Sequence, residues 1–200
     1  MNATNVVINA KDSAEIASNI TANNNVNITA GNGVTFTEST NTASNQGTAV
    51  NVGIGAGTTI NVETGVAVPH VNGSVGVNKT DNASSTATGA NVAAGNDIKI
   101  NANNGDVNLH GTNLVSNNSV EVEGNKVNTS GAISSVNEKN LTINVNGSYA
   151  SGKPDGGINA KGKNEANVTN TANTIQSDNV VITTGSPTGL SVNNTAINGN

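Results

Sequence analysis

The stretch VVINAKDSAEIASNITANNNVNITAG, residues 6–31, carries the pattern that decides the fold. Apolar and polar side chains alternate over residues 5–10, and the same alternation returns 20 residues later over residues 25–30. An alternation of period two places Val and Ile on one face of a β-strand and Asn, Thr and Lys on the other. Asn-Gly pairs such as Asn32-Gly33 suit sharp corners, because both residues tolerate positive φ angles. The stretch therefore predicts short strands joined by corners, with a return after about 20 residues.

The same pattern recurs at residues 98–124 (IKINANNGDVNLHGTNLVSNNSVEVEG) and, truncated, at residues 180–200 (VVITTGSPTGLSVNNTAINGN). Within the second copy, the pair Ile98/Ile100 returns as Val120/Val122 after 22 residues and as Leu141/Ile143 after 21 more. Repeats at a fixed spacing indicate stacked units that are stable only together.

Composition favours stacked layers over a single compact core. The 200 residues include 41 Asn, 24 Thr, 23 Gly and 17 Ser, whereas the only aromatic residues are Phe36 and Tyr149. Disordered chains have high net charge and few β-branched residues, but this chain has a net charge of only −5 and many Val, Ile and Thr residues. We therefore predict an all-β fold, a right-handed parallel β-helix (solenoid) with about 20–22 residues per coil and projecting β-hairpin insertions. Asn side chains at equivalent corners are expected to form hydrogen-bonded ladders along the stack.

The predicted core is a continuous stack of inward aliphatic side chains with a single aromatic ring. Its members are Val6, Ile8, Ile16, Ile20, Val26, Ile28, Val34, Phe36, Ile98, Ile100, Val107, Leu109, Leu114, Val120, Val122, Val180, Ile182, Leu190, Val192 and Ile197.

The repeat copies divide the chain into alternating coils and insertions. Coils are predicted over residues 1–38, 94–145 and 174–200, separated by a linker with an antiparallel hairpin extension over 39–93 and a polar insertion over 146–173. Within the first insertion, residues 39–50 are expected to be loop-like and 79–89 a flexible tether, whereas Val50–Gly57, Val66–Val68 and Val75–Val77 are expected to be hairpin strands. Within the second, residues 153–157 (KPDGG) form a turn cluster.

The succession of apolar-x-apolar, small, Gly units resembles the haemagglutinin repeats of filamentous haemagglutinin and related two-partner-secreted exoproteins. The units that carry the resemblance are Ala94–Ile100, Gly105–Leu114 and the step from Val34–Ser39 into Val50–Gly55. The resemblance implies a β-helical shaft that is exported through an outer-membrane partner transporter and displayed at the cell surface. It also implies a secreted, outer-membrane-associated location, although the first 30 residues contain no signal-peptide pattern.

The sequence offers little chemistry. His70 and His110 are the only histidines and lie 40 positions apart, so no metal site is expected. Glu121 and Glu123 share one strand face, where they could bind a cation or act as general acid and base, but a solvated face fits them better. With no Arg and no Trp, the chain lacks the residues that polysaccharide-cleaving β-helices use. We therefore predict no enzyme activity and no cofactor.

Scattered lysines and a negative net charge argue against nucleic acid as a partner, and no apolar run is long enough to span a membrane. The expected function is a structural shaft segment of a surface adhesin that contacts a receptor or glycan on host or neighbouring cells. One alternative is the stalk of a contact-dependent growth-inhibition toxin. A more distant alternative is an ice-binding solenoid, suggested by Thr-x-Thr at Thr35 and Thr169.

Overall fold

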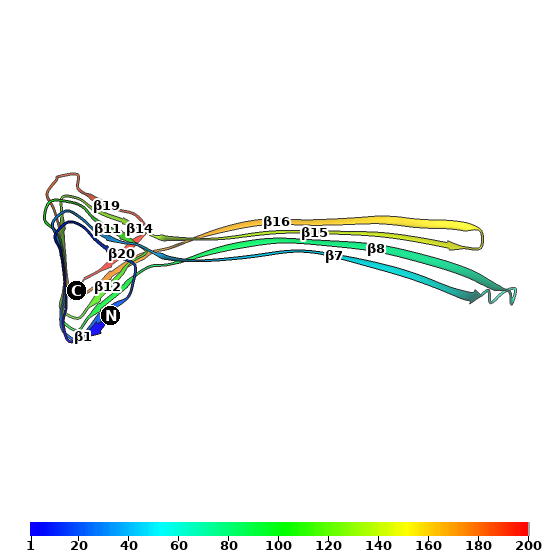
Figure 1. The fold of residues 1–200 in the computed structure, drawn as a ribbon, viewed down its shortest axis with the longest axis horizontal. Helices are drawn as coiled ribbons and strands as arrows, with labels where there is room; N and C mark the ends of the chain where they lie inside the picture. Colours follow the sequence, from blue (N-terminus) through cyan, green and yellow to red (C-terminus); the bar gives the residue numbers. More distant parts are fainter. Residues whose placement is uncertain (200) are drawn as a thin grey trace. The chain divides into compact units, whose positions relative to one another are not determined.

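The computed structural model describes residues 1–199, and within them every regular element is a β-strand. The strands form two compact units (Figure 1). The first, the three-sheet unit, contains residues 1–41, 85–135 and 168 onward. The second, the four-stranded sheet, is built around residues 42–84 and 136–167. The all-β prediction is confirmed.

The three-sheet unit consists of three sheets in which all neighbouring strands are parallel. Sheet A contains, in spatial order, β1 (Asn2–Ala3), β4 (Ile20–Ala22), β9 (Asn91–Ala94), β12 (Asn113–Ser116), β17 (Asn173–Gln176) and β20 (Thr195–Asn198). Sheet B contains β2 (Val6–Ala10), β5 (Val26–Ala30), β10 (Asp97–Ala102), β13 (Ser119–Gly124) and β18 (Asn179–Thr184). Sheet C contains β3 (Ala14–Ile16), β6 (Val34–Phe36), β11 (Val107–His110), β14 (Val127–Ser130) and β19 (Leu190–Val192).

Successive strands of this unit visit sheets A, B and C in turn, so each three strands form one layer of a stack. Val6 pairs with Val26, 20 positions later, and Ile98 pairs with Val120, 22 positions later. Val26 pairs with Ile98 across the first insertion. Short parallel strands in this order are compatible with a β-solenoid, in which each layer buries its aliphatic residues between the layers on either side.

The hydrophobic core runs through all three sheets. Of the predicted stack, Val6, Ile16, Ile20, Val26, Ile28, Val34, Phe36, Ile98, Ile100, Val107, Leu109, Leu114, Val120 and Val122 are buried, and Ile8, Val180 and Ile182 are partly buried. The core also contains residues that the sequence pattern left out, namely Val92, Val127, Ile175 and the alanines at 22, 30, 90, 94 and 102. These small side chains fill the space that aromatic rings occupy in other cores.

The last part of the predicted stack differs from expectation. The side chains of Leu190, Val192 and Ile197 are 49%, 43% and 42% exposed. Their strands, β19 and β20, lie at the ends of sheets C and A, so no described strand covers them. Their register with the buried strands is nevertheless regular, since Leu190 pairs with Val127 and Ile197 with Ile175.

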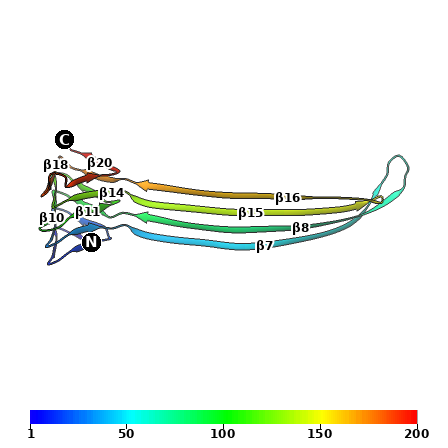
Figure 2. The ribbon, with the colours of Figure 1, turned by 90° about the horizontal axis from the view of Figure 1, so that it is seen from above.

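The four-stranded sheet contains two long hairpins in the order β16–β15–β8–β7. Its strands are β7 (Ser39–Ile60), β8 (Ala67–Thr88), β15 (Ala132–Ala150) and β16 (Lys153–Thr171). Figure 2 shows β7 and β15 running in one direction and β8 and β16 returning. Ser151 and Gly152 have positive φ angles of 53° and 75° between β15 and β16, which is the conformation of a two-residue type I′ hairpin turn.

Several insertion residues differ from the sequence prediction. Residues 39–50 and 79–88, expected to be a loop and a tether, lie in strands β7 and β8. They pair with each other, as the hydrogen bond from Gln46 Nε2 to Asp81 Oδ1 (3.0 Å) shows. Alternation cannot reveal such strands when both faces of the sheet meet solvent, because neither face needs apolar residues.

The second insertion is longer than the repeat pattern indicates. Coils are predicted up to residue 145, but residues 132–150 form β15 of the four-stranded sheet. Leu141 and Ile143 therefore do not continue the stack, and the true neighbours of Val120 and Val122 are Val180 and Ile182. The turn expected at residues 153–157 lies instead at Ser151–Gly152, and Pro154 lies within β16, an edge strand that does not need its missing N–H.

Candidate binding surfaces

Polar side chains at the corner before sheet B form a ladder that links neighbouring layers. The backbone N–H of Asn25 donates to Asn5 Oδ1 (3.2 Å), and that of Asp97 donates to Asn25 Oδ1 (3.3 Å). Ser119 Oγ and Asn118 Nδ2 then donate to Asp97 Oδ1 at 2.6 and 2.7 Å. These hydrogen bonds, that of Ser119 above all, lower the pKa of the Asp97 carboxyl below its usual range. The corner side chains thus satisfy backbone donors between layers.

The outward face of sheet B carries the charged groups that the sequence analysis singled out. Lys99 Nζ donates to Glu121 Oε2 at 2.9 Å, and Asn101 Nδ2 donates to Glu123 Oε2 at 2.9 Å. The hydrogen bond and charge of Glu121 raise the pKa of the Lys99 ammonium. Each carboxylate is therefore paired with a neighbour on the adjacent strand, in a solvated ladder rather than in a cleft.

The two histidines occupy separate places. His110 lies in β11, with its Nδ1 against the Ser130 hydroxyl, whereas His70 lies in β8, 3.2 Å from Thr59 Oγ1. Over residues 1–199, no three His, Cys, Asp or Glu side chains gather in the way a metal site requires.

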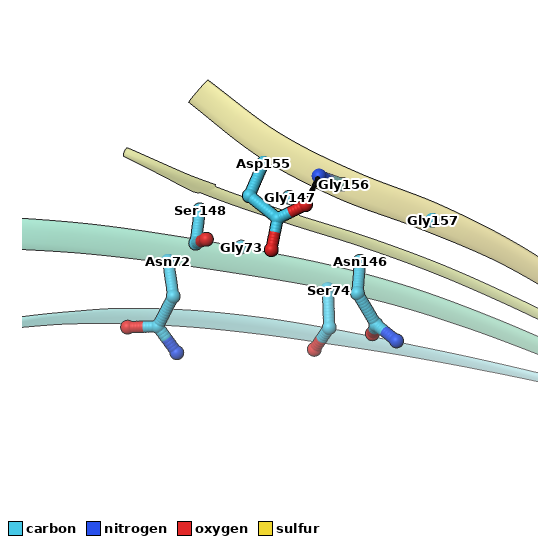
Figure 3. Close-up of a pocket in the computed structure, with 9 residues that line it drawn as sticks. All are labelled: Asn72, Gly73, Ser74, Asn146, Gly147, Ser148, Asp155, Gly156 and Gly157. Atoms are coloured by element: carbon cyan, nitrogen blue, oxygen red, sulfur yellow. Dashed lines mark hydrogen bonds between the residues drawn. The ribbon is translucent and has the colours of Figure 1, made fainter. Parts of the chain in front are cut away.

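The largest hollow, with a volume of about 560 Å³, lies on the four-stranded sheet. Figure 3 shows the side chains of Asn72, Ser74, Asn146, Ser148 and Asp155 pointing to the same side of the strands. The Asp155 carboxylate accepts a hydrogen bond from the Gly156 backbone N–H at 2.9 Å. No aromatic ring lines the hollow, so it lacks the stacking platform and enclosing apolar wall of a typical ligand pocket.

The sequence analysis missed one important polar residue, Asn173. Its side chain is buried in β17, where Oδ1 accepts from the Thr112 N–H (2.6 Å). Its Nδ2 donates to the Ser130 carbonyl (2.9 Å) and to Thr195 Oγ1 (3.1 Å). Asn173 thereby joins the layers on both sides of it. In a chain with 41 Asn residues, nothing local marks this one as buried.

These surfaces contain ladders of paired polar groups and no enclosed reaction centre among the described residues. The residues that the sequence pattern placed in one stack do meet, but they meet as packing partners. The described part of the chain also contains no helix that is long and apolar enough to cross a membrane.

The family model described as "Hemagglutinin repeat" matches residues 71–200, and the chain belongs to this family. No curated protein and no solved structure was found that matches the chain. Proteins of this family are secreted or cell-surface exoproteins of the adhesin-like, structural kind, and they are exported by two-partner secretion through an outer-membrane transporter. The matched region begins within β8 and includes every later strand of the three-sheet unit.

Proposed function

We propose that the chain is a non-enzymatic shaft segment of a surface exoprotein that mediates adhesion or cell–cell contact. In this proposal the three-sheet unit is a right-handed parallel β-helix with 20–22 residues per coil, which extends the protein away from the cell. The observation that carries the proposal is the unbroken register of aliphatic residues, exemplified by Val6, Val26, Ile98, Val120 and Val180 in sheet B.

A shaft needs rigidity along its axis and does not need a particular pocket. Layers that pair strand to strand along all three sheets supply this rigidity, because bending the stack would break backbone hydrogen bonds. The same register would let coils form one after another as the chain leaves the transporter. The hairpin residues 50–78 would then be available to contact a receptor or glycan on another cell.

The stalk of a contact-dependent growth-inhibition toxin would use the same shaft to support a toxic domain. The shaft geometry serves both roles equally, so the proposal is defined at the level of the shaft. An ice-binding solenoid fits less well, because such a surface needs Thr-x-Thr in every layer. Thr35 lies in β6, but Thr169 lies in β16 of the four-stranded sheet.

The proposal can be tested by removing whole layers. Deleting residues 98–119 removes β10, β11 and β12, so that β9 is followed directly by β13 and the rotation through sheets A, B and C is kept. A matched deletion of residues 98–108 removes about half a layer and breaks that rotation. Both would be made in the exoprotein carrying a distal epitope tag, with its transporter co-expressed.

We expect the 22-residue deletion to preserve secretion, display of the tag and cell–cell contact, and the half-layer deletion to abolish display. Substituting Ile100 or Val122 with Asp should act like the half-layer deletion, because each would bury a charge in the stack. Loss of cell contact with intact display after the 22-residue deletion would show that these residues bind a target themselves. Normal display after the half-layer deletion would also contradict the shaft proposal.

A further inference from the structure

The two faces of the four-stranded sheet differ in chemistry. Gly53 lies opposite Ser74 on one face, where a β-carbon would be 2.7 Å from the Ser74 hydroxyl oxygen, and Gly55 lies opposite Asn72 in the same way. Gly76 approaches Asn144 on this face. Because side chains alternate along a strand, these contacts fix which residues share each face.

Ion pairs extend this assignment to β16. Lys163 Nζ contacts Glu138 Oε2 at 3.0 Å and Glu165 Oε2 at 2.9 Å. Glu138 is an even-numbered residue of β15, as is Asn144, so Lys163 lies on the polar face. The even-numbered residues of β16, such as Ile158, therefore lie on the other face. The sheet thus has a polar face of Asn, Ser, Gly, Lys and Glu residues.

The other face, here called the apolar face, carries aliphatic residues in rows across the strands. The register that follows from the glycine contacts and from the Ser151–Gly152 turn places Val52, Val75, Val145 and Ile158 side by side. The next row contains Val50, Val77, Ile143 and Ala160. Side chains of the central row are exposed by 41% to 77%. Such a contiguous exposed apolar surface marks an interaction site in soluble proteins.

A third row gives the apolar face a knob and a groove. Ile54 is followed across the strands by Gly73, Gly147 and Gly156, so its side chain has no neighbour in its row and is 86% exposed. The three glycines leave a furrow beside Val75, Val145 and Ile158. A protruding aliphatic side chain and a glycine furrow of matching chemistry on one surface are self-complementary, which is what a two-fold interface requires.

We propose that the apolar face binds the same face of a second copy of this chain, forming a two-layer β-sandwich. The rows cover about 30 Å along the strands and about 19 Å across them, at about 3.4 Å per residue and 4.8 Å per strand. Two copies would therefore bury about 1,200 Å², which reaches the size of stable protein–protein interfaces. Sheets packed face to face with Val and Ile side chains interdigitate in this way. The inference concerns lateral pairing and does not depend on the shaft proposal.

The test uses the full chain in analytical ultracentrifugation from 1 to 100 µM. Val145→Asp places a carboxylate at the centre of the apolar face, and Asn146→Asp places the same group one residue away on the polar face, as its matched control. Both positions are accessible to solvent in the single chain, so each variant should fold, which circular dichroism verifies. We expect the wild type and Asn146→Asp to dimerise, and Val145→Asp to bind at least about tenfold more weakly, because an unpaired charge would be buried.

Tyr149 supplies a second readout, because it is the only tyrosine, there is no Trp, and it lies on the apolar face with 55% of its surface exposed. Acrylamide quenching of its fluorescence should fall as the wild type dimerises. A wild type that stays monomeric at 100 µM would overturn the proposal, as would equal dimerisation of Val145→Asp. A dimer that leaves Tyr149 quenching unchanged would place the contact elsewhere. Protection of Tyr149 in a monomer only after phosphatidylcholine/phosphatidylglycerol vesicles are added would assign the face to lipid instead.

Discussion

Replacing Asn173 with Leu should expose how the stack depends on a buried amide. Leu has a similar volume but no polar atoms, so the Thr112 N–H loses its acceptor at 2.6 Å. Thr112 is fully buried, and water cannot replace the lost partner. The Ser130 carbonyl still accepts from the Gly111 N–H at 2.8 Å, so a single orphaned donor remains from the backbone. An unsatisfied buried donor costs about 1–3 kcal/mol.

Native-state hydrogen exchange measures this cost at the affected amide. Because about 1.4 kcal/mol corresponds to a factor of ten, exchange of the Thr112 amide should become roughly 5- to 150-fold faster. Asn91→Leu, at an exposed position in the same sheet, is the matched control and should change little. Unchanged protection of the Thr112 amide in Asn173→Leu would refute the reasoning, and equal effects of the two variants would show a general cost of Leu in sheet A.

Three further predictions concern the three-sheet unit. Gly105→Ala should destabilise it by about 1–3 kcal/mol in urea unfolding, because the new β-carbon would overlap the Asn32 carbonyl oxygen, whereas Gly47→Ala, which meets open space, should be neutral. Phe36→Ala should cost about 3–5 kcal/mol by the same assay, since the ring is fully buried; a loss below 1 kcal/mol would mean that the layers close over the cavity. The pKa of Asp97 is lowered by folding, so its carboxylate stabilises the fold above its unfolded pKa, and this contribution disappears as the pH falls through the folded pKa. Acid titration from pH 5 to 2 should therefore destabilise the wild type more than Asp97→Asn, and parallel curves would contradict the assignment.

Much of the three-sheet unit could be predicted because its signal is local and repeated. Val26 and Ile28 announce a strand by alternation alone, and the 20- and 22-residue returns identify which strands pair. The alignment of Val180 with Ile98 is reproduced by the register, through Val120. Stacking short parallel strands is the one arrangement that buries such sparse aliphatic stripes without a globular core.

The extent of the insertions could not be predicted in the same way. Leu141 and Ile143 have the alternation and the spacing of a further coil, yet they belong to β15. A strand of a two-faced sheet and a strand of a stacked coil show the same period, so only the pairing partner distinguishes them. The burial of Asn173 and the exposure of Leu190 were equally hidden, because each depends on which layer covers the residue.

By itself, then, the sequence determined the strand period, the corner residues and the order of the layers, since these follow from steric and hydrophobic preferences of neighbouring residues. The tertiary structure alone decided where the stack is interrupted, which amide is buried, and that the two hairpins join into one sheet with an apolar face. Each of these depends on contacts between residues far apart in the chain, such as Gly76 with Asn144. Local alternation carries no information about such contacts, because it is satisfied equally by every partner of the same register.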